Sequence, residues 1–280
     1  MVMSETINCL DGKKGNDVIR DLLSSQEPVM ISRLGKIEAE CLNFFLHEGT
    51  WPDYWKPQLQ NNAGFFPITD DMIIQFCNEF LDHVKHTDVM AIWLGHLDEF
   101  IVEKFCPTAS RVALRSLEPY YHENPWSSAL AGKRVLVVHP FEESIKCQYE
   151  KRTKLFKDPG VLPEFELMTV KAIQSSSGNP VPFETWFHAY EHMRNEIIKK
   201  DFDIALVGAG AYGLPIASFI KRLGRKVVHM AGATQVLFGI KGLRWDKHED
   251  ISKLYNSHWV RPLPSERPDN FLTVEGGCYW

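Results

Sequence analysis

The chain has 280 residues, 44% of them hydrophobic, which is enough to build the core of one large α/β domain. Its formal net charge is -5 and no Lys/Arg run dominates any segment, so nucleic acid is not an expected partner. No stretch approaches the ~20 apolar residues of a membrane span, and the N-terminus lacks the apolar core of a signal peptide. We therefore expect a soluble, cytoplasmic protein with a single domain over residues 1–280.

The six cysteines form no C-x-x-C pair, and most lie among apolar residues. Scattered cysteines of this kind are typical of buried, reduced thiols, whereas a zinc site or a disulfide framework needs closer spacing. The residues concerned are Cys9, Cys41, Cys77, Cys106, Cys147 and Cys278.

The hydrophobic pattern alternates between short apolar runs and amphipathic segments. In the first half of the chain it predicts strands at 28–33, 89–94, 111–116 and 134–139, helices at 36–46, 69–85 and 97–105, and a loop at 51–67. In the second half it predicts helices at 144–156, 183–200 and 215–223, strands at 166–174, 204–207 and 226–230, and a short helix at 235–240. This order predicts an α/β fold with one mostly parallel, doubly wound, Rossmann-like sheet. The tail 257–280 is expected to be irregular and to pack over a face of the sheet.

The first predicted strand ends in the sequence S-R-L-G-K-I-E, just before a helix. Parallel sheets bind ligands at the carboxyl ends of their strands, where an arginine such as Arg33 can form two bonds to a diphosphate. Gly35 and Lys36 lie in the same loop. Glu38 could bind a metal ion or a sugar hydroxyl, although an acidic residue at this place also simply favours a helix N-terminus.

The loop at 51–67 is long and rich in aromatic and amide side chains, which suit sugar stacking and hydroxyl recognition. Asn61, Asn62 and Phe65 are therefore candidates for contact with an acceptor. The alternative is that the aromatic residues pack into the core beneath the loop.

Acidic and histidine side chains follow two further strands, and any of them could remove a proton from a substrate hydroxyl. Asp98 comes after the strand at 89–94. His139, Glu142 and Glu143 come after the strand at 134–139. The alternative for the three acids is that they cap or open the helices that follow.

A glycine-rich turn joins the strand at 204–207 to a helix, with Gly208, Gly210 and Gly213 spaced as G-x-G-x-x-G. Such a turn brings bare backbone N–H groups against a phosphate, and Ala209 and Tyr212 belong to it. A glycine turn can also serve close packing alone.

A nicotinamide-binding oxidoreductase is one interpretation of this turn, but it needs an acidic residue at the end of the next strand. No acid occurs here between Val228 and Asp246, so another phosphate-bearing ligand is favoured. His229 stands where that acid would be and could contact a ribose or a base, or be a core histidine. Gln235 could also reach the ligand.

The R-x-G-x-x-E sequence of residues 33–38 resembles the R-x-G-D-G-E motif of the GT-D-type glycosyltransferases. The segment from the glycine turn onward resembles the same group. The HPFEESI, LPEFEL, GATQVLFGIKG and VEGGCYW segments are similar to those of GT-D-like proteins of surface-polysaccharide biosynthesis. The resemblance implies a GT-D-like fold and transfer of a sugar, hexose or pentose, from a nucleotide donor such as a UDP-sugar to a glycan acceptor.

The chain departs from the resembled motif at one position that matters for metal binding. Lys36 stands where the family has a metal-holding Asp, so Glu38 alone remains as a ligand, and a single carboxylate makes a poor Mg²⁺ or Mn²⁺ site. Our hypothesis is that Lys36 and Arg33 neutralise the departing diphosphate instead. A non-catalytic relative that binds a glycan or scaffolds a synthase is the remaining alternative.

Overall fold

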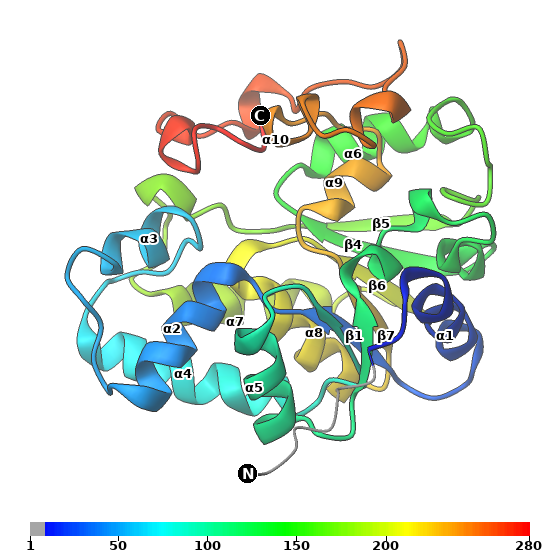
Figure 1. The fold of residues 1–280 in the computed structure, drawn as a ribbon. Coiled ribbons are helices and arrows are strands. Elements are labelled where there is room, and N and C mark those ends of the chain that lie inside the picture. The colour runs from blue at the N-terminus through cyan, green and yellow to red at the C-terminus, as the bar shows by residue number, and fades with distance from the viewer. Residues whose placement is uncertain (1–8) are drawn as a thin grey trace.

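The computed structural model describes residues 9–280, and its centre is one seven-stranded sheet (Figure 1). Every strand runs parallel to its neighbours. The spatial order is β3-β2-β1-β7-β6-β4-β5. The strands are β1 (Met30–Arg33), β2 (Val89–Ile92), β3 (Ser110–Ala113), β4 (Arg134–His139), β5 (Glu166–Lys171), β6 (Ile204–Val207) and β7 (Lys226–His229). The predicted fold class is therefore confirmed.

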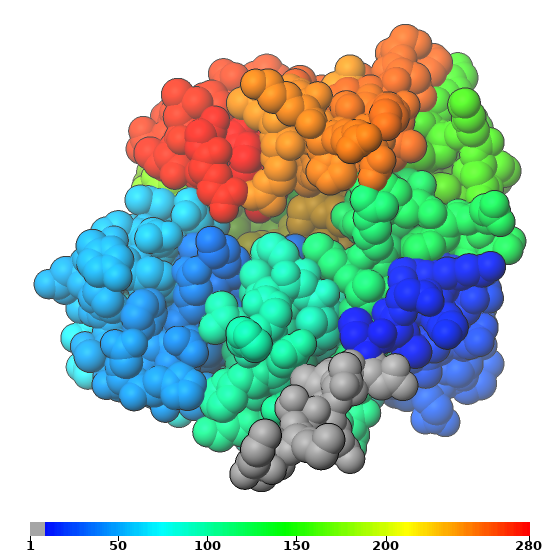
Figure 2. Space-filling model, viewed as in Figure 1, coloured from blue at the N-terminus to red at the C-terminus, as the bar shows by residue number. Residues whose placement is uncertain are grey.

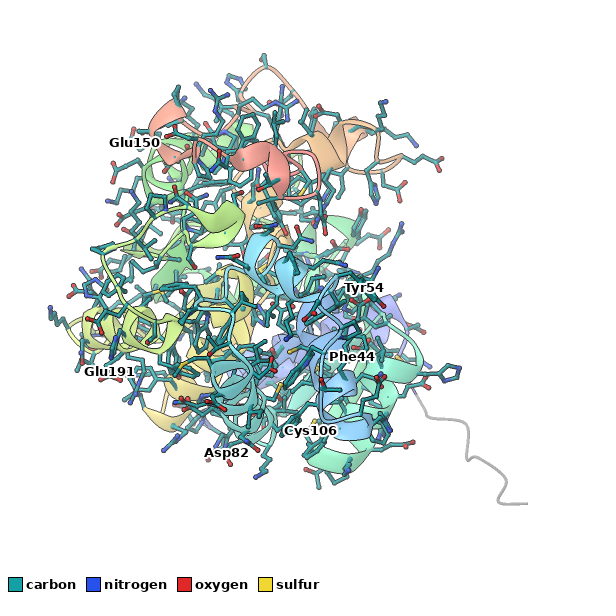
Figure 3. The ribbon with its side chains drawn as sticks, turned by 90° about the vertical axis from the view of Figure 1, so that its left-hand side faces the viewer. Phe44, Tyr54, Asp82, Cys106, Glu150 and Glu191 are labelled. Carbon is teal, nitrogen blue, oxygen red and sulfur yellow. The ribbon has the colours of Figure 1, made fainter. Side chains whose placement is uncertain are left out.

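Helices cover both faces of the sheet. One face carries α2 (Lys36–His47), α3 (Lys56–Asn61), α4 (Asp70–Val84), α5 (His96–Phe105), α7 (Trp186–Ile197) and α8 (Gly213–Arg222). Figure 3 shows this layer, with Phe44, Asp82 and Glu191 labelled on α2, α4 and α7. The other face carries α1 (Gly12–Ser24), α6 (Glu142–Tyr149), α9 (Ala233–Leu237), α10 (Leu243–Asp246) and the C-terminal tail. Successive residues of the central strands alternate between the two cores, which explains why β6 (IALV) and most of β4 (RVLVVH) are apolar on both faces.

The winding of the sheet reverses between β4 and β6. The chain leaves β4 through α6 and reaches β5 on one side, while it leaves β6 through α8 and reaches β7 on the other. Because α6 and α8 lie on opposite faces, a crevice opens between the carboxyl ends of β4 and β6. Open α/β sheets bind their ligands at such a point.

Several element boundaries differ from the sequence prediction. The helix predicted at 144–156 begins at Glu142 and ends at Tyr149, and the strand predicted at 166–174 ends at Lys171. The loop at 51–67 contains the short helix α3, and α1 and α10 were not predicted. By contrast β4 and β6 have the predicted bounds, because each is a buried apolar run.

The structure also bears on the expectations for the cysteines, the membrane and the N-terminus. All six cysteines are free; four are buried as expected, while Cys9 and Cys147 are exposed. Over residues 9–280 no helix combines the length and apolar character needed to cross a bilayer. The expectation that no signal peptide is present concerns in part residues 1–8, which lie outside the described residues.

The C-terminal tail is irregular and packs over one face, as expected. Its Trp259, Val274 and Trp280 are buried in the core on the α6 side. In Figure 2 the surface is hollowed between this tail, in red and orange, and the segment in blue that carries α2 and α3. The tail therefore forms one rim of a cleft at the carboxyl edge of the sheet.

The tail is fastened to α6 by the buried carboxylate of Glu266. Glu143 and Ser144 donate their backbone N–H groups to it at 2.9 and 3.1 Å, the Leu263 N–H donates at 3.2 Å, and the Ser144 hydroxyl also donates. The residue that precedes α6, Phe141, offers no side-chain cap of its own. A distant residue thus caps this helix, which no local sequence pattern indicates.

We expect Glu266→Ala to lower the free energy of unfolding by about 2 kcal/mol, because it leaves several donors at a buried helix end without a partner. Urea denaturation measures the difference. The matched control is Asp269→Ala, an exposed acid of the same tail with no ion pair among residues 9–280, which should change little. Equal losses in the two variants would contradict the capping role.

Candidate functional site

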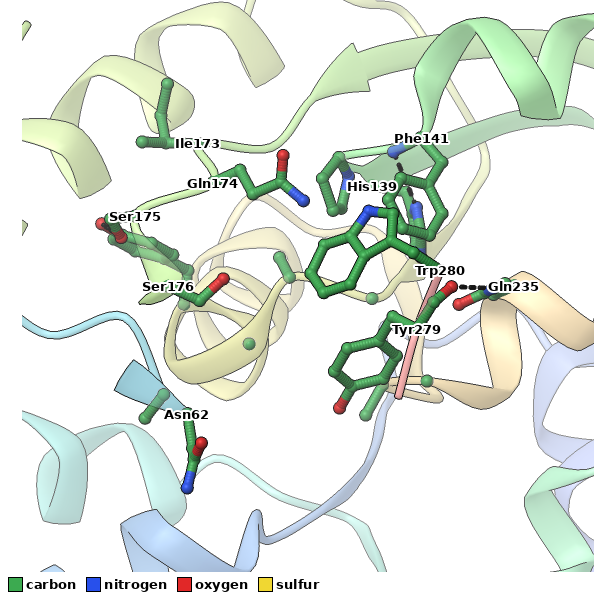
Figure 4. Close-up of a pocket in the computed structure, with 18 residues that line it drawn as sticks. Asn62, His139, Phe141, Ile173, Gln174, Ser175, Ser176, Gln235, Tyr279 and Trp280 are labelled. Carbon is green, nitrogen blue, oxygen red and sulfur yellow. Dashed lines mark hydrogen bonds between the residues drawn. The ribbon is translucent and has the colours of Figure 1, made fainter. Parts of the chain in front are cut away.

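A pocket lies in the crevice where the sheet reverses its winding (Figure 4). Ligand sites of open α/β sheets occur at such a point. The walls come from the segments that follow β4, β5, β6 and β7. Residues 62–63, directly after α3, and the end of the C-terminal tail complete them. The lining residues are Asn62, Ala63, His139, Pro140, Phe141, Ile173, Gln174, Ser175, Ser176, Gly208, Ala209, Gly210, Tyr212, Ala231, Gly232, Gln235, Tyr279 and Trp280.

The pocket lining contains no Asp, Glu, Lys or Arg. Aromatic rings, side-chain amides, serine hydroxyls and backbone groups form its surface instead. Figure 4 shows the Trp280 indole beside Gln174 and His139, with the Tyr279 ring below it. Such a lining suits a planar, uncharged group that carries hydrogen-bonding atoms.

The glycine loop contributes two free donors to this pocket. The N–H groups of Gly208, Ala211 and Tyr212 donate to other backbone carbonyls. Those of Ala209 and Gly210 have no such partner within residues 9–280. Gly210 has a φ of +53°, which favours glycine, and both Ala209 and Gly210 line the pocket. Two adjacent free N–H groups are suited to an anionic oxygen.

The other two glycines of the motif are needed for close packing. A Cβ on Gly208 would lie 2.6 Å from the Ala231 carbonyl oxygen and 2.7 Å from Cδ2 of His139. A Cβ on Gly213 would overlap Nε2 of His229. The packing alternative raised from the sequence is therefore correct for these two positions, while Gly210 is a conformational requirement.

His139 lines the pocket in its neutral form. Its Nδ1 accepts the backbone N–H of Phe141 at 3.0 Å, and burial lowers the pKa of the imidazole to about 3. The proton of the neutral ring is therefore on Nε2, as assigned from this hydrogen bond. In this arrangement His139 can donate a hydrogen bond to a ligand, but Nε2 cannot take up a proton. Its predicted role as a base is not favoured.

His229 is a core residue beneath the glycine loop, outside the pocket lining. Its Nδ1 lies 3.0 Å from the Ser32 hydroxyl, and burial lowers its pKa to about 3. Because the ring packs against Gly213, it is not placed to contact a ribose or a base. The core-histidine alternative describes it correctly.

Gln235 and Tyr212 are fixed parts of the wall. The Gln235 amide donates to the carbonyls of Lys241 and Tyr279 at 2.8 and 2.7 Å, which leaves its Oε1 without a partner in the described chain. Tyr212 stacks on Trp186 with ring centres 4.7 Å apart, and its hydroxyl lies 3.0 Å from that of Ser175. Both residues lie where the sequence predicted a donor site.

Arg33 lies at the end of β1, on the same edge of the sheet. Its guanidinium carbon is 4.2 Å from the ring centre of Trp93, and it donates to the Leu34 carbonyl at 3.0 and 3.1 Å. Burial lowers its pKa, while Tyr279 and Glu38 act in the opposite direction. Within the described chain no carboxylate lies within 4.0 Å of this half-buried cation. An anionic ligand could fill that role.

Lys36 and Gly35 were predicted to bind the donor, but both lie outside the pocket lining. The Lys36 ammonium lies 3.8 Å from Glu40 on α2, and its side chain is 64% exposed. Gly35 precedes α2 and is covered by the carboxyl group of Glu38, which a Cβ at that position would overlap. The hypothesis that Lys36 replaces a metal ion is not supported by this placement.

The carboxyl groups of Glu38 and Asp98 are turned towards backbone N–H groups. Burial raises the pKa of Glu38, whose carboxyl group bonds to its own backbone. Asp98 accepts the N–H groups of Trp93 and Leu94 at 2.6 and 2.5 Å, and burial raises its pKa too. No group of three His, Cys, Asp or Glu that could hold a metal ion occurs among residues 9–280. These residues do not fit a divalent-metal site.

Glu142 and Glu143 lie at the start of α6 and outside the pocket lining. Burial alone would raise the pKa of Glu142, but the Thr169 hydroxyl at 2.5 Å and the Lys146 ammonium at 3.1 Å bring it below its usual value. Glu143 lies 2.8 Å from the same ammonium. The alternative reading, that these acids open the helix, fits the structure.

Of the three residues predicted to contact an acceptor, one lines the pocket and two do not. Asn62 lines the pocket, whereas Asn61 ends α3 outside it. Phe65 is fully buried, with its ring 4.9 Å from that of Phe76 and 5.9 Å from that of Trp186. It therefore packs in the core beneath the loop, as the alternative held.

Several wall residues were missed by the sequence analysis. Tyr279 and Trp280 come from the far end of the chain, in the tail that was expected only to pack over a face of the sheet. The Trp280 indole N–H donates to the Glu266 carbonyl at 3.1 Å, so the capping residue also holds this wall. The sequence signal for these two wall residues was the VEGGCYW segment, which contains both of them.

The two buried imidazoles make stability dependent on pH. Their pKa of about 3 lies below the unfolded value of about 6.5, so the unfolded chain binds protons that the folded chain does not. Their contribution is complete above pH 6.5 and is lost as the pH falls towards 3, by up to about 1.4 kcal/mol per pH unit for each histidine. Urea denaturation at a series of pH values should show a smaller loss in His229→Leu. An unchanged pH dependence would contradict this.

Comparison with known proteins identifies no relative by sequence and only distant structural matches. No protein-family model matches the chain, and neither does any curated protein. Two solved structures match it at 12% identity and a TM-score of 0.38, over 77–78% of this chain and 82% of theirs. One is a selenomethionine-substituted structure of the domain of unknown function 1792, and the other describes that domain as having a distinct glycosyltransferase fold. At this TM-score the likeness says nothing about the chemistry of the site.

Proposed function

We propose that this protein transfers a sugar from a nucleotide-sugar donor, such as a UDP-hexose or UDP-pentose, to a glycan acceptor. The observation that carries the proposal is the combination of an uncharged, aromatic pocket with two N–H groups and a nearby arginine that have, respectively, no hydrogen-bond acceptor and no carboxylate partner among residues 9–280. The uncharged pocket suits the base and ribose of a nucleotide, and the N–H groups and the arginine suit the diphosphate of the same nucleotide.

The spacing of the strands supports a shared diphosphate site. Only β7 separates β6, which carries the glycine loop, from β1, which carries Arg33. At ~4.8 Å per strand, the two ends are about 10 Å apart. Tyr279 lines the pocket and also lies close enough to Arg33 to influence its pKa, so the pocket and the arginine are neighbours.

In this proposal the residues stabilise the charge that develops on the leaving diphosphate. Arg33 and the N–H groups of Ala209 and Gly210 donate hydrogen bonds to its oxygens, and Nε2 of His139 donates to the donor within the pocket. The acceptor oxygen forms a bond to the anomeric carbon of the donor sugar as the bond from that carbon to the diphosphate breaks. The acceptor hydroxyl gives its proton to a base, and the nucleoside diphosphate leaves. Glu38 and Asp98, whose charges act on Arg33, are the proposed candidates for the base.

A nicotinamide dehydrogenase is not favoured by the site. Such an enzyme holds the ribose of its cofactor with an acidic residue at the end of β7. In this chain residues 229–232 contain no acid, and His229 is buried under Gly213. A nucleotide-sugar or glycan-binding protein without transferase activity is the second candidate. The observation in its favour is the absence of Asp and Glu from the pocket lining.

Thermal unfolding in the presence of about 1 mM UDP, GDP, dTDP or NAD⁺ tests the nucleotide site, because a ligand of the folded state raises the unfolding temperature. We expect one of the nucleoside diphosphates, in the first place UDP, to raise it and NAD⁺ to leave it unchanged. A rise with NAD⁺ alone, or with none of the four, would contradict the proposal.

Hydrolysis and transfer assays then separate an enzyme from a binding protein. We expect slow release of UDP from a UDP-sugar, and the release should persist in EDTA, since Lys36 stands where the resembled motif has its metal-holding Asp and no group of three His, Cys, Asp or Glu among residues 9–280 is arranged to hold a metal ion. Binding of UDP without any turnover across a panel of UDP-sugars would favour the second candidate. Activity strictly dependent on Mn²⁺ would overturn the metal-independent form of the proposal.

A further inference from the structure

Trp93 lies directly after β2, one strand beyond Arg33 on the ligand-binding edge of the sheet. It is 38% exposed, whereas Trp126, Trp186 and Trp280 are at most 7% exposed. An indole of this size left in contact with water loses favourable burial.

The exposed indole is nevertheless held rigidly. Its N–H donates to the Leu34 carbonyl at 2.8 Å, and its backbone N–H donates to Asp98 at 2.6 Å. The same Leu34 carbonyl accepts two bonds from Arg33, whose guanidinium lies 4.2 Å from the indole centre. One carbonyl thus fixes the arginine and the tryptophan relative to each other.

This arrangement places an aromatic surface beside the proposed phosphate-binding group. In the nucleotide-sugar the sugar ring is attached to the second phosphate, so a phosphate on Arg33 brings a sugar ring close to Trp93. The acceptor ring must also reach this point for transfer to occur. The teal segment that follows β2 borders the hollow seen in Figure 2, which gives a substrate access.

We infer that Trp93 is a stacking platform for a sugar ring, set beside the diphosphate by its fixed contact with Arg33. The inference rests on the proposed function and adds a sugar subsite to it. The apolar C–H face of a pyranose or furanose ring packs on the open part of the indole, as apolar groups pack on aromatic surfaces. The stacked sugar ring is that of the donor or that of the acceptor, and both present the same apolar C–H face to the indole.

The test compares Trp93→Leu with Trp93→Phe, which keeps an aromatic face but loses the bond to Leu34. Calorimetry gives the dissociation constants of UDP and of UDP-glucose, UDP-galactose, UDP-N-acetylglucosamine and UDP-xylose. If the donor sugar stacks on the indole, Trp93→Leu weakens the preferred UDP-sugar by about tenfold more than it weakens UDP, while Trp93→Phe retains most of the difference between the two ligands. If the acceptor ring stacks there, Trp93→Leu changes the two dissociation constants by the same factor and KM for the acceptor rises by about tenfold.

A second readout does not depend on turnover. In protein labelled with 5-fluorotryptophan, the ¹⁹F resonance missing from Trp93→Phe identifies Trp93, and it should shift with a sugar ligand more than with UDP. The inference is overturned if UDP binds but neither the resonance nor any sugar-dependent constant responds to Trp93. Failure of UDP itself to bind would instead overturn the proposed function, and the platform with it.

Discussion

Replacing Gly213 by alanine lowers the free energy of unfolding by about 3 kcal/mol, because the new methyl group meets the buried ring of His229. Helix propensity alone would give the opposite sign, since Gly213 begins α8 at a φ of −58° and alanine is the better helix former. The ring has little room to move, because its Nδ1 is held by Ser32. Urea denaturation measures the loss.

The matched control is Gly12→Ala at the first residue of α1. A Cβ there would have no neighbour closer than 3.6 Å, so no loss is expected. In a His229→Ala background the Gly213→Ala substitution should cost almost nothing, because its clash partner is gone. A cost that is the same in both backgrounds would show that the overlap with His229 is not the cause.

The largest expected effect on ligand binding comes from Arg33→Met, which should weaken the binding of UDP by about 100-fold. Methionine keeps much of the side-chain volume but removes the hydrogen bonds proposed for the diphosphate. Stability should fall little or even rise, because the substitution also removes a half-buried charge without an ion pair. Isothermal calorimetry measures the affinity.

Lys36→Met is the matched control for that variant. Lys36 lies three residues away, carries the same charge and points towards Glu40. Its substitution should leave the affinity for UDP within a factor of about two. If Lys36→Met weakens UDP as strongly as Arg33→Met does, the sequence-based hypothesis for Lys36 is right and the placement of the site is wrong.

The sequence predicts the sheet well because its strands are short, buried and apolar. β4 and β6 were predicted with their observed bounds, and the glycine loop between β6 and α8 was recognised from spacing. Such signals are local. They do not distinguish Gly210, which requires a positive φ, from Gly208 and Gly213, which are needed for packing against residues of other strands.

The rest of the site depends on long-range contacts that the sequence does not display. Tyr279 and Trp280 reach the pocket because Glu266 caps α6 and holds the tail in place. Arg33 and Trp93 meet because β1 and β2 pair in a register that sets Arg33 opposite Ala91. Pairings of this kind follow from tertiary structure, so a prediction from local pattern cannot reach them.

A crystal structure with UDP bound tests the central claim most directly. The account predicts the uracil and ribose in the pocket between His139 and Trp280, with the diphosphate oxygens within hydrogen-bond distance of both Arg33 and the N–H groups of Ala209 or Gly210. A nucleotide that binds away from this edge of the sheet, or whose phosphates contact neither Arg33 nor the glycine loop, would contradict it.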